Sequence, residues 1–354
     1  LLSIYGRDNC TFAVLEPCEG RHRMGFPTYN ESWVFAVYER TQKEYMLLYE
    51  NADIIITRVW DNFGVIENSL KKGKLVFYAS ERWFKPTLGK GRLLLPSYLS
   101  RYLKYKRLSN YSNFYYLAMG FYASLDFKFL GLCKNRIFNF GYFTPPFRGG
   151  MVEISKKKTI EILWAGRLLH WKRVIDLILV FENLVEHYNV NLTIIGEGPT
   201  RKRLEKYTND NKIPNVVFKE FVGNEDLKRT MLDSDIYVLP SSGYEGWGAV
   251  INEAMQTKCA VIVAKETGSA KSMIVDGVNG LTFSTGDRRA LKTCLIKLLE
   301  DKDLLHKLKE EGYKTITEIW SGSEAGDRFS IIVERIKKGE SIDVYRDGPM
   351  QIIG

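Results

Sequence analysis

Residues 236–255 read IYVLPSSGYEGWGAVINEAM, and this stretch decides the fold. The apolar run Ile236–Leu239 predicts a buried strand, the Pro, Ser and Gly residues after it predict a loop, and Ala249–Gln256 predicts a helix. Short apolar runs alternate with amphipathic stretches on both sides of this segment, from Ile160 to Thr317. Strands and helices that alternate at this spacing predict βαβ units and a parallel sheet with helices on both faces. Ligands of such sheets bind at the carboxyl ends of the strands, so the loops that follow strands are the candidate sites.

The predicted strands fall in two groups. In the second half they are Ile160–Ala165, Leu192–Ile195, Val216–Phe218, Ile236–Leu239, Ala260–Ala264 and Leu281–Phe283. The first half is less regular, with predicted strands at Asp53–Thr57, Lys74–Tyr78 and Arg136–Phe140 and a predicted helical segment at Tyr111–Phe129. The turn-rich stretch from Thr144 and a lysine run after it predict a linker. The expected domains are residues 1–148, a linker at 149–158, residues 159–320, and a C-terminal helix and tail at 321–354 that crosses back to the first domain.

The composition is that of a folded chain, with 354 residues, 45% hydrophobic and 26% charged. Its net charge of +9 is unevenly placed. Residues 1–150 hold 21 basic and 12 acidic side chains, and the remaining 204 residues hold 30 of each. The first half also carries 31 of the 46 aromatic residues. Two halves with different binding partners are the simplest interpretation.

The cysteines and the apolar runs indicate the cellular compartment. Five scattered cysteines without a CxxC pair exclude a zinc ribbon and favour a reducing cytosol over a disulfide framework. No apolar run approaches the ~18 residues that span a bilayer, and we expect no signal peptide. The sequence begins without Met, and we expect the first domain to lack its opening strand.

Two loops after predicted strands carry cations or glycines. The loop after Ile160–Ala165 contains Gly166, Arg167 and Lys172 at the start of a helix. Cations beside free helix-start amides suit a diphosphate, although a solvent-exposed basic loop has the same sequence. The loop after Leu192–Ile195 contains Gly196 and Gly198, which allow a ligand to lie against the backbone or simply form a tight turn.

The loop of the opening segment adds carboxylates. Gly246 and Gly248 leave bare amides at the start of the helix that follows. Glu245 lies in the loop and Glu253 lies inside the helix, roughly 7–8 Å further along its axis. Two carboxylates at this separation suit the sugar hydroxyls and the ribose hydroxyls of a nucleotide-sugar. For either glutamate alone, a solvated helix or loop residue is the simpler interpretation.

The motifs Gly-Arg-x4-Lys, Gly-x-Gly-Pro, Pro-Ser-x3-Glu-Gly-x-Gly and Glu-x7-Glu occur in order at the βα loops of one domain. This set resembles the donor-binding domain of the retaining glycosyltransferases of family 4, over about 160–335. The resemblance implies the GT-B fold, an α/β architecture with two Rossmann-like parallel-sheet domains that face each other across a cleft. It also implies catalytic roles for Arg167, Lys172 and Glu245. Donor contacts are implied for Gly166, Gly196, Gly198, Glu245, Gly246, Trp247, Gly248, Ala249 and Glu253. The family's usual Lys-Gly is Lys172-Arg173 here.

The resemblance implies front-face attack with retention, and cations stabilise the departing nucleoside diphosphate without a metal. No cofactor and no metal site are expected, with a UDP- or GDP-linked sugar as co-substrate. Asp233-Ser234-Asp235 matches the metal-binding Asp-x-Asp of another glycosyltransferase fold. Here, however, it caps the end of a predicted helix, just before the predicted strand Ile236–Leu239. We therefore interpret it as structural.

The first half holds the acceptor-side candidates, Glu81 and Arg82, which follow the predicted strand Lys74–Tyr78. From Arg82 to Arg107 there are eight basic residues and no acid. Ser97–Arg107 predicts a basic helix that either lies on an anionic membrane or is merely solvated. Nucleic acid would suit the same charge, but no motif for it is present.

The sequence therefore predicts a bacterial glycosyltransferase that moves a hexose from a nucleotide-diphosphate sugar to a lipid-linked or glycan acceptor. The expected setting is cell-envelope polysaccharide or lipopolysaccharide synthesis, in the cytoplasm and peripherally at the inner membrane face. Two alternatives remain: a non-catalytic sugar-nucleotide-binding protein, and a GT-B-like enzyme such as a nucleotide-sugar epimerase.

Overall fold

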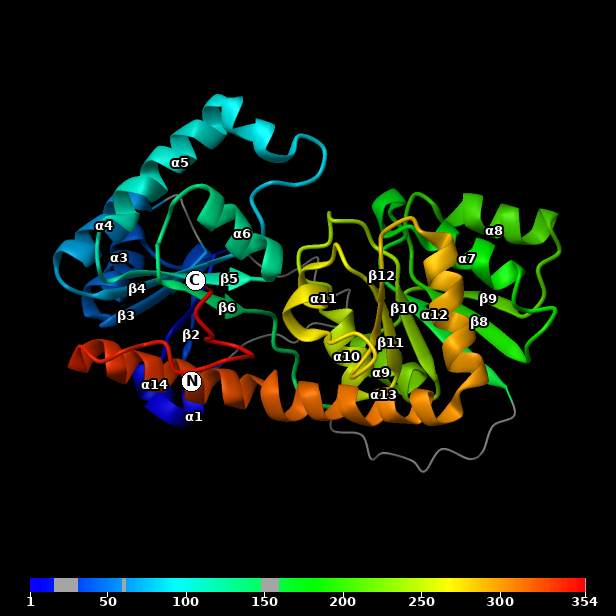
Figure 1. Cartoon of the computed structure of the whole chain (residues 1–354). Helices are drawn as coiled ribbons and strands as arrows, with labels where there is room; N and C mark the ends of the chain where they lie inside the picture. Colours follow the sequence, from blue (N-terminus) through cyan, green and yellow to red (C-terminus); the bar gives the residue numbers. More distant parts are fainter. Residues whose placement is uncertain (16–30, 59–61, 148–158, 354) are drawn as a thin grey trace. The chain divides into compact units, whose positions relative to one another are not determined.

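The computed structural model of the protein describes residues 1–15, 31–58, 62–147 and 159–353. The chain divides into two compact units (Figure 1). One unit consists of Leu1–Gly141 together with Ser323–Gly354, and the other of Tyr142–Gly322. The predicted linker at 149–158 lies outside the described residues.

The second unit contains a six-stranded parallel sheet in the order β12-β11-β10-β7-β8-β9. Its strands are β7 (Ile160–Ala165), β8 (Val190–Ile195), β9 (Val216–Lys219), β10 (Ile236–Leu239), β11 (Ala260–Ala264) and β12 (Leu281–Phe283). Its helices are η4 (His170–Lys172), α7 (Val174–Glu182), α8 (Arg201–Asp210), α9 (Asn224–Leu232), α10 (Val250–Gln256), α11 (Gly268–Met273), α12 (Arg288–Glu300), α13 (Lys302–Lys314) and the π-helical turn η5 (Thr315–Ile319). All six predicted strands are confirmed, with ends within two residues.

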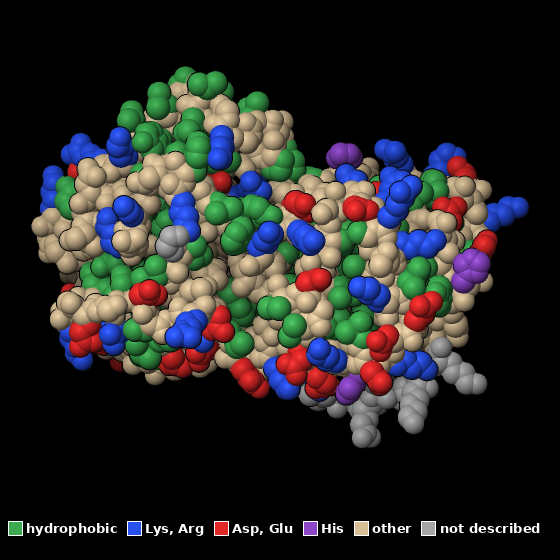
Figure 2. Space-filling view, viewed as in Figure 1, with side chains coloured by type: hydrophobic (Ala, Val, Ile, Leu, Met, Phe, Trp, Pro, Cys, Tyr) green, Lys and Arg blue, Asp and Glu red, His purple; other side chains and the backbone are tan. Residues whose placement is uncertain are grey.

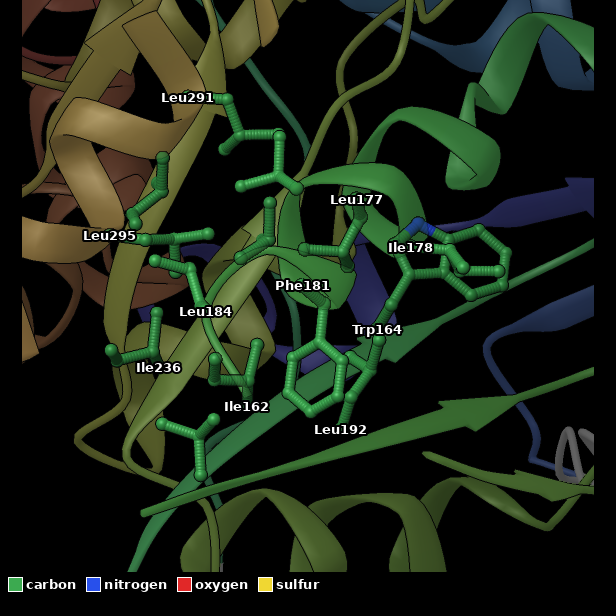
Figure 3. Packing of buried hydrophobic residues seen from close by; sticks show 14 of the residues in the cluster. Ile162, Trp164, Leu177, Ile178, Phe181, Leu184, Leu192, Ile236, Leu291 and Leu295 are labelled. Atoms are coloured by element: carbon green, nitrogen blue, oxygen red, sulfur yellow. The ribbon is translucent and has the colours of Figure 1, made fainter. Parts of the chain in front are cut away.

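Alternation along the strands gives this sheet two apolar faces. Ile162 and Trp164 of β7 pack against α7 and α12 in one cluster, which Figure 3 shows around Phe181. Leu163 and Ala165 point the other way and pack against α9, α10 and α11. The central strands β10 and β11 are buried at every residue, as expected for a parallel sheet covered by helices, whereas the edge strand β9 is not.

The first unit contains a four-stranded parallel sheet in the order β3-β4-β5-β6 and a two-stranded sheet of β1 and β2. The strands are β1 (Phe12–Val14), β2 (Val34–Ala36), β3 (Ile54–Thr57), β4 (Leu75–Ser80), β5 (Phe114–Met119) and β6 (Ile137–Phe140). The helices are α1 (Leu2–Tyr5), η1 (Arg7–Asn9), η2 (Val37–Glu39), α3 (Gln42–Asn51), α4 (Phe63–Lys71), η3 (Gly89–Leu94), α5 (Pro96–Ser109), α6 (Phe121–Phe129) and the C-terminal α14 (Gly322–Lys338).

The predicted helical segment Tyr111–Phe129 is wrong over its first half. The strand β5 occupies Phe114–Met119, and only Phe121–Phe129 is helical. Every residue of β5 is buried, so an apolar run with no polar face belongs to a central strand rather than a surface helix. Gly120 separates the two elements with a φ of 100°, a conformation that glycine adopts without strain.

Aromatic rings fill the core of the first unit. Tyr116 of β5 stacks on Phe127 of α6 with ring centroids 3.5 Å apart, on the face that α4, α5 and α6 cover. On the opposite face, Phe77 of β4 contacts Phe329 of α14 at 4.7 Å. The C-terminal helix therefore completes the core of the sheet that the first 141 residues build.

Candidate functional site

The loop after β7 is held by its neighbours in the sheet. Gly166 donates its N–H to the Ile195 carbonyl at 3.0 Å, and Leu168 donates to the Glu197 carbonyl at 2.8 Å. The backbone N–H of Ser242, in the loop after β10, donates to the Trp171 carbonyl at 2.9 Å. Three βα loops are thus tied together at the carboxyl end of the sheet.

The loop ends at an unusual backbone position. Arg173 lies just before α7 in the left-handed region, with φ 55° and ψ 34°. Its guanidinium pairs with the buried Asp176 at 2.6 Å, and Arg288 of α12 pairs with the other oxygen of that carboxylate at 2.8 Å. The left-handed conformation explains why the family pattern has glycine at this position, and the ion pair offsets the strain of an arginine there.

Gly196 and Gly198 make room for protein backbone. A Cβ atom on Gly196 would lie 1.9 Å from the Gly166 carbonyl oxygen, and one on Gly198 would lie 2.5 Å from the Leu168 oxygen. Their φ values of 136° and 155° also disfavour side chains. The structure therefore gives these glycines a role in packing the β7 and β8 loops together.

The loop after β10 places Glu245 against the loop after β7. The Lys172 ammonium group forms an ion pair with Glu245, and their side chains are only 14% and 12% exposed. The Glu245 N–H donates to the Ser242 carbonyl at 2.9 Å, so a tight turn fixes the carboxylate. Two residues that the sequence assigned to separate parts of a donor therefore meet at one point.

A pocket of about 220 Å³ opens beside this ion pair. Six of the predicted site residues line it: Gly166, Lys172, Glu245, Gly248, Ala249 and Glu253. Sequence reasoning missed its apolar wall, which consists of Ala165, Ile195, Phe221, Val222, Leu227 and Val250. Phe221 and Val222 lie in the loop after β9, so the rule that ligands lie at strand ends would have pointed to them.

Glu253 is the pocket's perturbed acid. Burial raises the pKa of Glu253 above its ordinary value, and the positive charge of Lys228 partly opposes that rise. Lys228 is itself almost fully buried in α9 and donates to the Pro145 carbonyl at 3.3 Å. Sequence reasoning missed Lys228 because a lysine in an amphipathic helix is ordinarily solvent-exposed.

The other predicted donor residues lie differently. Arg167 is exposed and makes no ion pair with the residues that the structure describes. The side chain of Trp247 is 1% exposed, donates its indole N–H to Asn252 at 2.9 Å and packs near Trp320. A contact of Trp247 with a ligand would therefore come from its backbone. The carbonyl of Gly246 closely abuts Gly268, at the start of α11.

Asp235 is engaged within the protein. Its Oδ1 pairs with Lys309 of α13 at 2.7 Å, and its Oδ2 accepts the Glu161 N–H at 3.0 Å. These contacts fasten β10 to β7 and α13, in agreement with a structural role for Asp233-Ser234-Asp235. Across the described ranges, no group of three or more His, Cys, Asp or Glu side chains is arranged to hold a metal ion.

In the first unit, Glu81 and Arg82 directly follow β4. Glu81 pairs with Lys85 at 3.6 Å, and the Arg82 guanidinium lies 4.9 Å from the centre of the Tyr122 ring. Both side chains are half-buried. The structure thus places the two acceptor-side candidates at the carboxyl edge of the first sheet.

Comparison with known proteins bears on both units. Residues 152–315 match the family model Glycosyl transferases group 1. The chain is 25% identical over 180 residues to poly(glycerol-phosphate) alpha-glucosyltransferase of Bacillus subtilis, covering 49% of this chain and 26% of that protein. It is 29% identical over 156 residues to the capsular polysaccharide biosynthesis glycosyltransferase CapM of Staphylococcus aureus, covering 43% and 40%. The alignments thus span less than half the length of these relatives.

The solved structure of Anabaena HepE in complex with UDP superposes with a TM-score of 0.66 at 15% identity, covering 82% of this chain and 81% of that one. At this identity the likeness concerns the fold. The predicted fold class, GT-B, is confirmed. No helix within the described part of the chain is both long and apolar enough to cross a membrane.

Proposed function

We propose that this protein is a retaining glycosyltransferase of family 4 that transfers a hexose from a nucleotide-diphosphate sugar. The observation that carries the proposal is the pocket beside Lys172 and Glu245, which lies within the region that matches the glycosyltransferase family model. It combines a cation, two carboxylates and an apolar wall in one small volume. A nucleotide-sugar presents the matching features: a diphosphate, hydroxyl groups and a flat base.

The donor would be oriented by charge and hydrogen bonding. Lys172, held in place by Glu245, would bind the diphosphate together with the exposed Arg167. Glu253 would accept hydrogen bonds from the ribose hydroxyls, and Glu245 from those of the transferred sugar. Gly248, with φ 86°, keeps the pocket wall free of a side chain and allows the donor to approach the backbone.

Bond cleavage moves negative charge onto the departing nucleoside diphosphate, while the anomeric carbon becomes oxocarbenium-like. A fixed cation at that point stabilises the transition state more than the ground state. Lys172 and Arg167 would supply this stabilisation, so the proposal assigns no role to a metal or a cofactor. We propose front-face attack with retention. In this reaction the leaving phosphate receives the acceptor's proton, and the scheme assigns no covalent nucleophile.

We further propose a UDP- or GDP-linked donor and a lipid-linked or glycan acceptor, in cell-envelope polysaccharide or lipopolysaccharide synthesis at the cytoplasmic membrane face. The names of the relatives, which include a poly(glycerol-phosphate) glucosyltransferase and a capsule glycosyltransferase, support this setting. The complex of HepE with UDP supports a uridine donor. Glu81 and Arg82 are the proposed acceptor contacts.

A thermal-shift screen over nucleotide-sugars identifies the donor, and calorimetry with that donor tests the site. We expect Glu253→Ala to weaken binding at least tenfold, because two ribose hydrogen bonds to a charged group are lost. Glu186→Ala, which removes an exposed glutamate of the same unit, is the matched control. Unchanged affinity of the Glu253→Ala variant would refute the assigned donor site.

Product analysis then separates the possible activities. Release of nucleoside diphosphate, slow with water and faster with a saccharide or lipid-linked acceptor, is expected of a transferase. An epimerase would convert the donor without any acceptor, and a non-catalytic binding protein would leave it intact. Either of these two results would contradict the proposal.

A further inference from the structure

The helix α5 exposes leucines on its outer side. Its inner side is buried through Tyr105 and Leu108, which pack in the core of the first unit. Leu95, the residue just before the helix, and Leu99 and Leu103 within it are 41%, 47% and 56% exposed. Since these residues are four positions apart, they form one stripe along the helix. A surface helix ordinarily presents polar residues there, so this stripe requires an explanation.

The stripe continues into the preceding segment. Leu94, at the end of η3, is 88% exposed, and Leu88 just before η3 is 55% exposed. Figure 2 shows hydrophobic side chains gathered over the region where α5 lies in Figure 1, with Lys and Arg beside them. Single exposed leucines are ordinary, but five exposed leucines between residues 88 and 103 indicate an interaction surface. We call Leu88, Leu94, Leu95, Leu99 and Leu103 the leucine surface.

The residues of η3 and α5 themselves carry charge of one sign only. Lys90, Lys104, Lys106 and Arg107 are exposed on the same two elements, and residues 82–107 contain no acid. Successive residues of an α-helix are rotated by about 100° around its axis. Lys106 therefore projects between Leu95 and Leu99, and Arg107 projects beside Leu103. Glu67 of α4 pairs with Arg107 at 2.5 Å, so one cation is partly neutralised and the others keep the surface positive.

We propose that η3 and α5 form a membrane-docking surface, in which the leucine surface enters the headgroup region of an anionic bilayer and the flanking lysines pair with lipid phosphates. The basic helix predicted from the sequence supplies only the electrostatic attraction. The exposed leucines supply the apolar burial that holds an amphipathic helix in the interface. Both contributions come from residues 88–107 of the first unit, so the proposal does not depend on the proposed enzymatic activity.

The chemistry favours a lipid surface over a second copy of the chain. Two copies joined through this surface would bring like charges together, which opposes association. An anionic bilayer offers an apolar region for the leucines and negatively charged phosphate groups for the lysines. Each Lys or Arg near such a leaflet adds to the electrostatic attraction, and added salt weakens that attraction by screening the charges.

The experiment is flotation of the full chain with vesicles of phosphatidylcholine alone or of phosphatidylcholine with roughly one third phosphatidylglycerol. We expect binding to the anionic vesicles at low salt. The triple variant Leu95→Ser/Leu99→Ser/Leu103→Ser should lower the partition coefficient by on the order of a hundredfold or more, since burial of one leucine side chain is worth roughly a factor of ten. Lys104→Gln/Lys106→Gln should lower the preference for anionic vesicles by roughly thirtyfold, since each exposed cation contributes separately to the attraction.

Matched substitutions keep the test specific. Leu47→Ser/Leu125→Ser/Ile331→Ser removes three comparably exposed apolar side chains from α3, α6 and α14, and it should bind vesicles as the unchanged protein does. Unaltered circular dichroism of the leucine variant establishes that it is folded. Three results would overturn the proposal: no binding of the unchanged protein at low salt, equal binding of the leucine variant, or a dimer in sedimentation that only the leucine variant dissociates.

Discussion

The two units share one plan, a parallel sheet between layers of helices, but they fill it with different side chains. In the second unit, Ile162, Trp164 and their neighbours form a mainly aliphatic core, and the βα loops interlock around a pocket. In the first unit, stacked rings such as Tyr116 and Phe127 form the core, and the outer helix α5 exposes leucines beside lysines. The same architecture thus separates a site for a small polar ligand from a surface suited to an extended partner.

This difference concerns where polar groups are placed. In the second unit, charged side chains such as Lys172, Glu245 and Glu253 turn inward at strand ends, where burial sharpens their interactions. In the first unit, the cations of α5 face solvent, where screening weakens each one and only their number matters. Single substitutions should therefore be severe in the pocket and mild on α5.

The largest expected effect tests whether the two cores are independent. Phe127→Ala should destabilise the first unit by about 3–5 kcal/mol, because it removes a fully buried ring that stacks on Tyr116 and contacts Trp83. Hydrogen exchange should show faster exchange in β4 and β5, with β7 and β10 unchanged.

The reciprocal change is Phe181→Ala, which removes a fully buried ring from the core of the second unit. It should speed exchange in β7 and β10 and leave β4 and β5 protected. If either variant loosened both sheets equally, the chain would unfold as one cooperative body, and the division into two units would have no energetic meaning.

The next effect concerns catalysis. Lys172→Ala should lower turnover by about 10²–10³-fold, the loss expected when one fixed group that stabilises developing charge is removed. Adding Arg167→Ala should bring transfer to background. Steady-state release of nucleoside diphosphate measures both, and Lys202→Ala/Arg203→Ala, an exposed pair on α8, is the control. Retained turnover of the double variant would refute the phosphate role.

The two units should separate kinetically as well. Arg82→Ala should slow transfer to the acceptor while leaving donor hydrolysis by water unchanged, because Arg82 lies in the first unit and outside the pocket. Lys172→Ala should slow both reactions. Equal losses of both reactions in the Arg82→Ala variant would contradict the assignment of this residue to the acceptor.

Prediction from the sequence succeeded where one local pattern determines the outcome. The strands β7, β10, β11 and β12 were predicted to the residue, because a buried parallel strand is a short apolar run between loop residues. It failed at β5, whose apolar run continues past Gly120 into α6 without a polar residue to mark the boundary. Where two neighbouring elements are both buried, periodicity cannot separate a strand from a helix.

The same limit applies to the site. Gly166, Lys172, Glu245, Gly248 and Glu253, which line the pocket, could be named from the sequence because they are chemically distinctive residues in or just after the loops that follow strands. The pairing of Lys172 with Glu245 was not predicted, since 73 residues separate them and only the sheet order brings their loops together. The leucine surface was also missed, because a leucine at helical spacing is ordinarily a core residue.

A smaller effect tests the backbone at the entrance to α7. Arg173 has left-handed φ and ψ angles and pairs with Asp176. Arg173→Ala loses the ion pair and keeps the strain, whereas Arg173→Gly loses the ion pair and relieves the strain. The glycine variant should therefore be more stable than the alanine variant by on the order of 1 kcal/mol, measured by urea unfolding. Equal stability would show that the loop does not hold this conformation in solution.

The smallest effect tests the burial of Glu253. Burial raises the pKa of this carboxyl, so the native state favours its protonated form more than the unfolded state does. Ionisation therefore weakens the native state as pH rises from about 4.5, the ordinary value, through the raised pKa. Glu253→Gln should raise Tm at pH 7 by about 2 °C and leave it nearly unchanged at pH 4.

Differential scanning calorimetry at both pH values measures this shift, and Glu186→Gln, at an exposed position of the same unit, should change neither. A stabilising Glu253→Gln that also loses donor affinity would mean that this buried charge is kept for binding at the expense of stability. A destabilising Glu253→Gln at pH 7 would mean that the attraction of Lys228 outweighs burial, and that the two residues act as a structural pair. The assignment of the ribose to Glu253 would then fall.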